Sequence, residues 1–227
     1  MDLKQINEDL KVRLRQEDFV SSKERLEKIA YYNNFKLSLL TKRYCNGCGN
    51  KENNKIVLPY GSPFSKIMIV LSEPTENEGI THTVAFDSGG RILDVIIDKL
   101  VDKSVIKRDN IYMTNIIKCY KKCDDKQNSF ICGVNNLQKE INLLKPEKII
   151  AFGDLAISVL NSISSGKELD IEAEQVHGKV VNMDLCNLEI PVLQTYNINI
   201  LIKNTGSLYK VYKHALWEEI YNFLNNK

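Results

Sequence analysis

The cysteines are the residues whose type and spacing most directly suggest chemistry. Cys45 and Cys48 form a C-x2-C pair with a glycine inside it, and Cys119 and Cys132 follow as single cysteines. Four thiolates from two loops can hold a tetrahedral zinc ion or a four-iron cluster, and the spacing does not separate these metals. Cys123 can replace a neighbouring ligand. Unrelated buried thiols are the alternative, because cysteine is among the most buried residue types.

Short apolar runs alternate with helical patterns from residue 66 onward. The runs predict strands over residues 66–71, 110–117, 148–152 and 190–195. The patterns between and after them predict helices over residues 90–101, 134–144, 155–160 and 208–224. This alternation is typical of a parallel sheet covered on both faces. We therefore expect an α/β fold, a three-layer α/β/α sandwich with a central, mainly parallel four-stranded sheet.

Polar residues follow each predicted strand. They are Ser72 and Glu73, Thr114 and Asn115, Gly153 and Asp154, and Tyr196 and Asn197. Because the carboxyl ends of parallel strands meet at one edge of a sheet, one carboxylate and two carboxamides converge there, from Glu73, Asn115 and Asn197. A turn or cap role explains any one of these residues alone, but their joint placement indicates a binding site.

The first forty residues carry a helical pattern in two parts. Apolar residues recur at steps of three and four, at Leu3, Ile6, Leu10 and Leu14. Ser21 and Glu24 then have the spacing of a capping box, which predicts a second helix after it. We therefore divide the chain into an N-terminal helical extension, residues 1–43, and one α/β domain, residues 44–227. The charged surface of the extension indicates a solvated face, with a contact to a partner or DNA as the alternative.

Composition excludes several classes of protein. Of the 227 residues, 43% are hydrophobic and 26% are charged, as in a folded globular protein. The 31 Lys and Arg against 29 Asp and Glu give a net charge of +2, so any polyanion site must be local. No apolar run is long enough to cross a membrane, and the charged start is no signal peptide. We expect a cytoplasmic protein. Its six cysteines should then form no disulfide framework, because that compartment keeps thiols reduced. Cys186 has no assigned role.

Several segments occur in a characteristic order along the chain. They are the C-x2-C pair, the run from Ile67 to Pro74, the run from Ile111 to Cys119, Cys132, and the run from Pro146 to Gly153. This order resembles the iron–sulfur uracil-DNA glycosylases, in particular the family 4 type and its divergent and phage-associated relatives. The resemblance extends from about Cys45 to Lys203 and is strongest at a Thr-Asn-x-x-Lys-Cys core that ends at Cys119.

The resemblance implies a cofactor and a reaction. A 4Fe–4S cluster would be held by Cys45, Cys48, Cys119 and Cys132. In that family the cluster is structural: it holds loops that grip DNA and takes no part in catalysis. The reaction is hydrolysis of the bond between a base and its deoxyribose in a nucleotide flipped out of DNA, which leaves an abasic site.

The resemblance also implies roles for residues near the strand ends. Glu73 would position the attacking water, and Asn197 would donate a hydrogen bond to the departing base. Asn115 would read the edge of the pyrimidine, and Phe86 would stack on it. Ser72 occupies the position where family 4 carries its glutamate, so it would line the substrate site.

A further set of residues is expected to contact DNA. Lys203 matches a family arginine, and His177 lies in a turn that is similar to the family's Arg-Gly-Lys. Lys121 and Lys122 lie with Lys118 in a lysine-rich stretch of the predicted cluster loop, where we expect the DNA backbone to run. An exposed, solvated loop is the alternative for this stretch.

The sequence departs from the family pattern in its first and last motifs. The carboxylate is shifted by one position, to Glu73, and Asn197 replaces the family histidine. An amide donates a hydrogen bond but no positive charge, and one such donor contributes about 3–4 kcal/mol. We predict a monomeric, monofunctional DNA glycosylase that acts on uracil or on a modified or damaged pyrimidine. The alternatives are a catalytically silent iron–sulfur DNA-binding relative in replication, repair or phage biology, and a zinc-binding nucleotide-handling protein.

Overall fold

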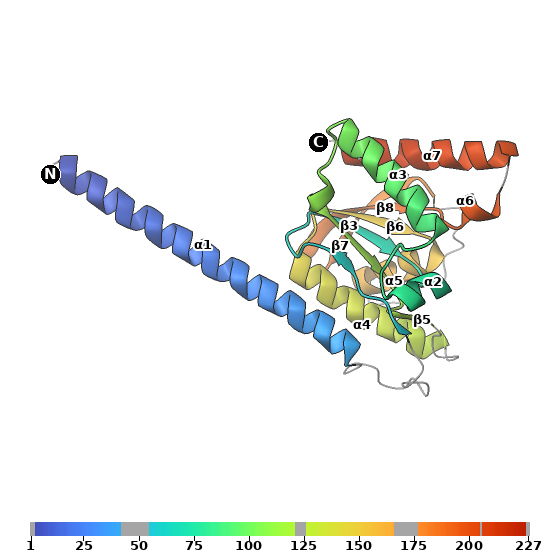
Figure 1. Cartoon of the computed structure of the whole chain (residues 1–227), viewed down its shortest axis with the longest axis horizontal. Helices are drawn as coiled ribbons and strands as arrows, with labels where there is room; N and C mark the ends of the chain where they lie inside the picture. The colour runs from blue at the N-terminus through green and yellow to red at the C-terminus, as the bar shows by residue number, and fades with distance from the viewer. Residues whose placement is uncertain (1–2, 42–54, 121–125, 166–176, 205, 226–227) are drawn as a thin grey trace.

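The computed structural model describes residues 3–41, 55–120, 126–165, 177–204 and 206–225. A central sheet with helices on both faces forms the body of the protein, and one long helix extends from it (Figure 1). The predictions for the C-x2-C pair, Cys123, Lys121 and Lys122 lie outside the described residues.

The central sheet has the strand order β2-β4-β3-β6-β8-β7. Its strands are β2 (Tyr60–Gly61), β3 (Ile67–Leu71), β4 (Ile111–Asn115), β6 (Lys148–Phe152), β7 (Lys179–Leu185) and β8 (Leu188–Thr195). The strands β4, β3, β6 and β8 run parallel, which confirms the four predicted strands. The sheet is wider than predicted, because β2 and β7 add to its two edges in the antiparallel sense.

Each face of the sheet has its own core. The helices are α2 (Glu76–Thr81), α3 (Ser88–Asp102), α4 (Lys126–Leu144), α5 (Asp154–Ser165), α6 (Ile200–Lys203) and α7 (Gly206–Asn225), with a 3-10 turn η1 (Arg108–Asn110). Since successive strand residues point to opposite faces, Met68 and Val70 pack in the core with α4 and α5, and Ile69 packs in the core with α3 and α7. Figure 1 shows these helix pairs on opposite sides of the sheet, which confirms the three-layer α/β/α prediction.

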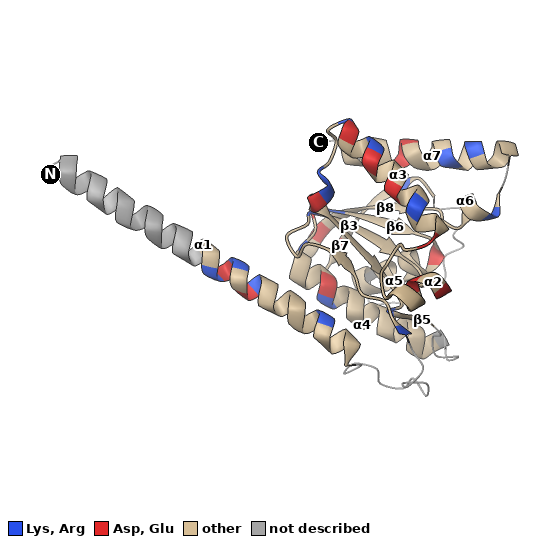
Figure 2. Cartoon of the chain, viewed as in Figure 1, with Lys and Arg blue, Asp and Glu red and all other residues tan. Residues whose placement is uncertain are grey.

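The surface of these layers carries charges of both signs. Lys and Arg are interspersed with Asp and Glu along α3 and α7 (Figure 2), in line with the small net charge of the chain. Among the described helices, none is both long and apolar enough to cross a membrane.

Helix α1 (Leu3–Leu40) is one continuous helix of 38 residues. The predicted break at Ser21 is wrong, because Ser21 and Glu24 are both exposed positions within the helix and nothing forces Ser21 out of a helical conformation. A capping box requires a non-helical first residue, so its spacing alone does not begin a helix. Tyr32 and Phe35 are buried against the domain, whereas the N-terminal end of α1 extends away from it (Figure 1).

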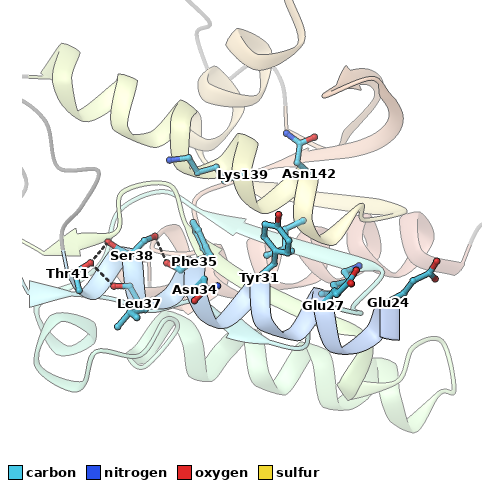
Figure 3. A pocket seen from close by; sticks show the side chains of 12 residues that line it. Glu24, Glu27, Tyr31, Asn34, Phe35, Leu37, Ser38, Thr41, Lys139 and Asn142 are labelled. Atoms are coloured by element: carbon cyan, nitrogen blue, oxygen red, sulfur yellow. Dashed lines mark hydrogen bonds between the residues drawn. The ribbon is translucent and has the colours of Figure 1, made fainter. Parts of the chain in front are cut away.

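The C-terminal end of α1 lies beside a second, two-stranded sheet of β1 (Lys55–Ile56) and β5 (Cys119–Tyr120). Phe35, Leu39 and Ile56 form a small buried cluster there. A groove of about 980 Å³ runs between α1 and α4, with Tyr31 and Leu37 among its α1 residues and Lys139 and Asn142 on α4 (Figure 3).

Candidate active site

A pocket lies at the carboxyl edge of the four parallel strands. It is lined from all four strand ends, by residues that include Ser72, Glu73, Asn115, Phe152 and Asn197. The structure thus brings together four of the residues that sequence analysis assigned to the substrate. The free volume of the pocket is about 30 Å³, far below the ~300–1,000 Å³ of typical ligand pockets.

Asn115 is the most buried polar residue of this pocket. It is the last residue of β4, where it pairs with Leu71 of β3, and it is only 2% exposed. Neither its amide nitrogen nor its amide oxygen makes a hydrogen bond of good geometry among the described residues, and the amide lies near enough to the Glu78 carboxyl to lower the pKa of that group. A buried polar group without a partner costs about 1–3 kcal/mol, so this amide is available to donate to and accept from a ligand.

Gly153 allows Ser72 and Asn197 to approach each other. It follows β6 with a φ of +83°, and a Cβ at this position would lie 3.0 Å from Asn197 Cβ and 3.1 Å from Ser72 Oγ. Glycine is suited both to this backbone conformation and to so close an approach. Ser72 Oγ donates a hydrogen bond to Phe152 O at 2.9 Å, so the Ser72 hydroxyl proton is engaged within the fold.

The two remaining polar residues of the pocket are more accessible. Asn197 is exposed, and its Oδ1 accepts a hydrogen bond from Asn199 N at 3.0 Å. Because the oxygen is engaged with the backbone, the NH2 group is the part of the amide that remains to donate. Glu73 is also exposed and lines the same pocket.

Glu78 is a pocket residue that sequence analysis missed. It lies in α2 and is 3% exposed; its Oε2 accepts from Thr75 N at 2.7 Å and its Oε1 from Ala85 N. Burial raises the pKa of the Glu78 carboxyl, and these two backbone donors together with the nearby Asn115 amide oppose this rise. The Thr75-x-x-Glu78 spacing is a capping box, which is present in the structure and was visible in the sequence.

The structure does not bring Phe86 to the pocket. Phe86 is 59% exposed and is not among the lining residues, so its stacking on the base stays a prediction. The neighbouring Ala85 has a φ of +59°, and Gly90 packs so closely against it that no Cβ fits there. This loop conformation directs Phe86 outward, and Phe152 is the aromatic residue that lines the pocket.

The family model of the uracil DNA glycosylase superfamily matches residues 58–221. The chain belongs to this superfamily. The match spans every strand of the central sheet and every residue that lines the pocket. Membership in the uracil DNA glycosylase superfamily supports a DNA glycosylase type of function and DNA as the partner.

Two of the four predicted cluster ligands lie in the described part of the chain. Cys119 begins β5, and Cys132 lies within α4 rather than ahead of it as predicted; both are half-buried. Asn136, one turn further along α4, donates from Nδ2 to Cys132 Sγ at 3.3 Å. The described His, Cys, Asp and Glu side chains form no group of three or more that could hold a metal. Cys45 and Cys48, whose segment joins α1 to β1, are outside that set.

Two of the predicted DNA contacts lie close to Asn197, His177 through a ring contact with its neighbour and Lys203 along the chain. The ring of His177 stacks on Tyr196, the neighbour of Asn197, with ring centroids 4.0 Å apart. His177 Nδ1 also lies 3.5 Å from Glu219 Oε1. Lys203 is the exposed last residue of α6, shortly after Asn197. Contact of these side chains with DNA stays a prediction.

Lys118 is not a surface lysine. Its side chain is 4% exposed, and its Nζ donates to Glu140 Oε2 at 2.6 Å. The expectation that Lys118 belongs to a basic surface is therefore wrong. The physical reason is tertiary: Glu140 in α4 supplies a buried partner at the end of β4.

Proposed function

We propose that this chain is a monofunctional DNA glycosylase that hydrolyses the N-glycosidic bond of uracil or a modified pyrimidine flipped out of DNA. The observation that carries the proposal is Asn115, a buried amide with no hydrogen bond of good geometry among the described residues, in one pocket with Glu73 and Asn197. Flipping is required because the bond to be cut is out of reach while the base is stacked in a duplex.

Asn115 suits the reading of a pyrimidine. The edge of uracil presents a carbonyl oxygen beside a ring N–H, and an asparagine amide offers a donor and an acceptor at once. The amide is already removed from water, so pairing with a base recovers about 1–3 kcal/mol. A base that lacks this pattern would leave the amide unpaired, which gives the pocket a means of discrimination.

Glu73 and Asn197 suit the hydrolysis itself. Water adds to C1′ of the deoxyribose while the C1′–N bond breaks, and the base leaves with the bonding electrons. We assign to the Glu73 carboxylate the positioning of this water and the acceptance of its proton. The NH2 group of Asn197 would donate to the base oxygen on which negative charge gathers, a contribution of about 3–4 kcal/mol for one well-placed donor.

The small free volume of the pocket favours a second candidate function. About 30 Å³ does not hold a pyrimidine ring, so entry of a base requires the pocket walls to move apart. A relative that has kept the fold and the binding of DNA but no longer excises a base would have no need of this movement. Asn197 in place of the family histidine points the same way.

We further propose that a 4Fe–4S cluster, with zinc as the alternative, is held by Cys45, Cys48, Cys119 and Cys132. Two observations support a shared site. The elements that flank the C-x2-C segment, α1 and β1, both contribute to the small cluster against which Cys119 packs. The hydrogen bond from Asn136 to Cys132 Sγ is of the kind that tunes cluster sulfurs. The cluster would tie loops together and would take no part in hydrolysis.

An excision panel separates the two candidate functions. Oligonucleotides with uracil or with modified cytosines and thymines are incubated with the protein, as single strands and as duplexes, and then treated with alkali. Cleavage at the modified position by the wild type, but not by Glu73→Gln, supports the glycosylase. Retained DNA binding with no cleavage of any substrate supports the silent relative, and loss of both refutes both proposals.

A further inference from the structure

We infer that Lys118 is a positioning residue that holds Asn115 in place at the pocket, from inside the protein. The inference concerns how Asn115 is fixed, and where it concerns base reading it rests on the proposed function. Its basis is a closed network of hydrogen bonds between the end of β4 and the C-terminal part of α4, beneath the pocket.

Every donor of the Lys118 ammonium has a partner. Nζ donates to Thr114 Oγ1, to Asn115 O at 2.7 Å and to Glu140 Oε2 at 2.6 Å. The other oxygen of Glu140 accepts from Tyr112 OH at 2.8 Å and from Thr114 Oγ1 at 2.7 Å. An ammonium has three protons, so no donor is left over, and the buried pair is fully satisfied.

The hydrogen bond from Lys118 Nζ to the Asn115 carbonyl connects this network to the pocket. The Asn115 side chain makes no hydrogen bond of good geometry among the described residues and has a weaker interaction with the Glu78 carboxyl, so its direction depends mainly on its backbone. On one side that backbone is fixed by the β3 pairing, which continues as Ile116 N donates to Leu71 O at 2.7 Å. On the other side it is fixed by the bond from Lys118 to the Asn115 carbonyl.

The buried Lys118–Glu140 ion pair contributes little to the stability of the fold. The cost of removing two charges from water largely cancels their attraction, and apolar side chains of similar size often stabilise a core as well or better. An ion pair with this many directed hydrogen bonds does, however, fix the geometry of the groups that it joins. Among the described residues, Asn115 is the one residue of the pocket to which the Lys118–Glu140 pair is hydrogen-bonded.

The double substitution Lys118→Met with Glu140→Gln isolates this contact. The amide introduced at position 140 still accepts from Tyr112 and Thr114, no charge is left unpaired, and the donor to the Asn115 carbonyl is gone. Lys66→Met is the matched control, because it breaks the exposed pair with Glu147, 2.9 Å apart, at the opposite end of β3.

Two readouts test the inference. Hydrogen exchange followed by mass spectrometry should show amides 115–117 of the double variant exchanging about tenfold faster than in the wild type, with the rest of the sheet unchanged. In the excision panel, the ratio of kcat/KM between the preferred pyrimidine and the next one should fall about tenfold. The Lys66→Met control should match the wild type in both.

The outcomes separate this inference from the proposed function. Unchanged exchange at 115–117 in a folded double variant overturns the positioning role, whatever the activity. Exchange that rises throughout the sheet, with an unchanged selectivity ratio, shows a merely structural pair and also overturns it. A wild type that excises nothing refutes the proposed function, and the local exchange result then decides the role of Lys118 by itself.

Discussion

Replacing Gly153 by alanine should disturb the pocket without disturbing the core. Gly153 has a φ of +83°, and its new Cβ would lie 3.0 Å from Asn197 Cβ, 3.1 Å from Ser72 Oγ and 3.2 Å from Asn197 Nδ2. Optimal contacts between carbon atoms are about 3.5–4.0 Å, so Asn197 has to move by several tenths of an ångström. The substitution therefore acts on the residue proposed to donate to the departing base.

Two costs follow from the structure. An alanine in this backbone conformation lowers the free energy of unfolding by about 1–3 kcal/mol. The donor on Asn197 contributes about 3–4 kcal/mol when well placed, and we take partial loss of it as about half. This corresponds to an excision rate about 10–30-fold lower than that of the wild type.

Gly206→Ala separates these two costs. Gly206 begins α7 with a φ of +65°, but among the described residues no atom beyond its chain neighbours and its own helix backbone lies within 4 Å of the Cβ that alanine would introduce. Both variants should lose stability in urea denaturation, whereas only Gly153→Ala should lose single-turnover excision. Wild-type excision by Gly153→Ala, or an equal loss in both variants, would refute the reasoning about Asn197.

Three other predictions concern the pocket and the proposed cluster. Glu73→Gln should lower single-turnover excision at least ~100-fold while DNA affinity stays within about twofold, and an undiminished rate would remove Glu73 from its role. Burial raises the pKa of Glu78, so the folded protein keeps this proton to a higher pH than the unfolded chain does. The contribution of Glu78 to stability is therefore largest below the ordinary carboxyl pKa and falls as the pH rises toward the raised pKa. Glu78→Gln removes this titration, so the urea midpoint of the variant should change less with pH over that range. An unchanged slope of urea midpoint against pH would contradict the assignment. Cys132→Ser should yield a colourless, iron-free protein from a brown wild type, whereas stoichiometric zinc in the wild type would contradict the iron–sulfur proposal.

The parallel strands could be predicted because each is a continuous apolar run, as strands covered on both faces are. Strand β7 was missed although Val181, Met183 and Leu185 alternate with polar residues, which is the pattern of a strand covered on one face. It joins β8 through a tight turn in which Cys186 and Asn187 have φ values of +58° and +64°. Turns of this kind favour Asn-Gly, and Cys-Asn carries little of that preference.

The pocket was predictable only in part. Asn115 and Asn197 were found because the ends of parallel strands must meet at one edge. Phe86 lies outside the pocket lining, and the left-handed conformation of its neighbour Ala85 could not be read from the sequence. Lys118 was taken for a surface residue, because its partner Glu140 is 22 residues away and only the packing of α4 on β4 brings them together.

The central claim is that this pocket releases a pyrimidine base from DNA, and mass spectrometry of the free base tests it most directly. The wild type should release one equivalent of free base per modified nucleotide and leave the strand intact until alkali is added. Asn115→Ala should bind the same DNA and release the base at least ~100-fold more slowly. No free base from any substrate, or equal rates for the two proteins, would contradict the claim.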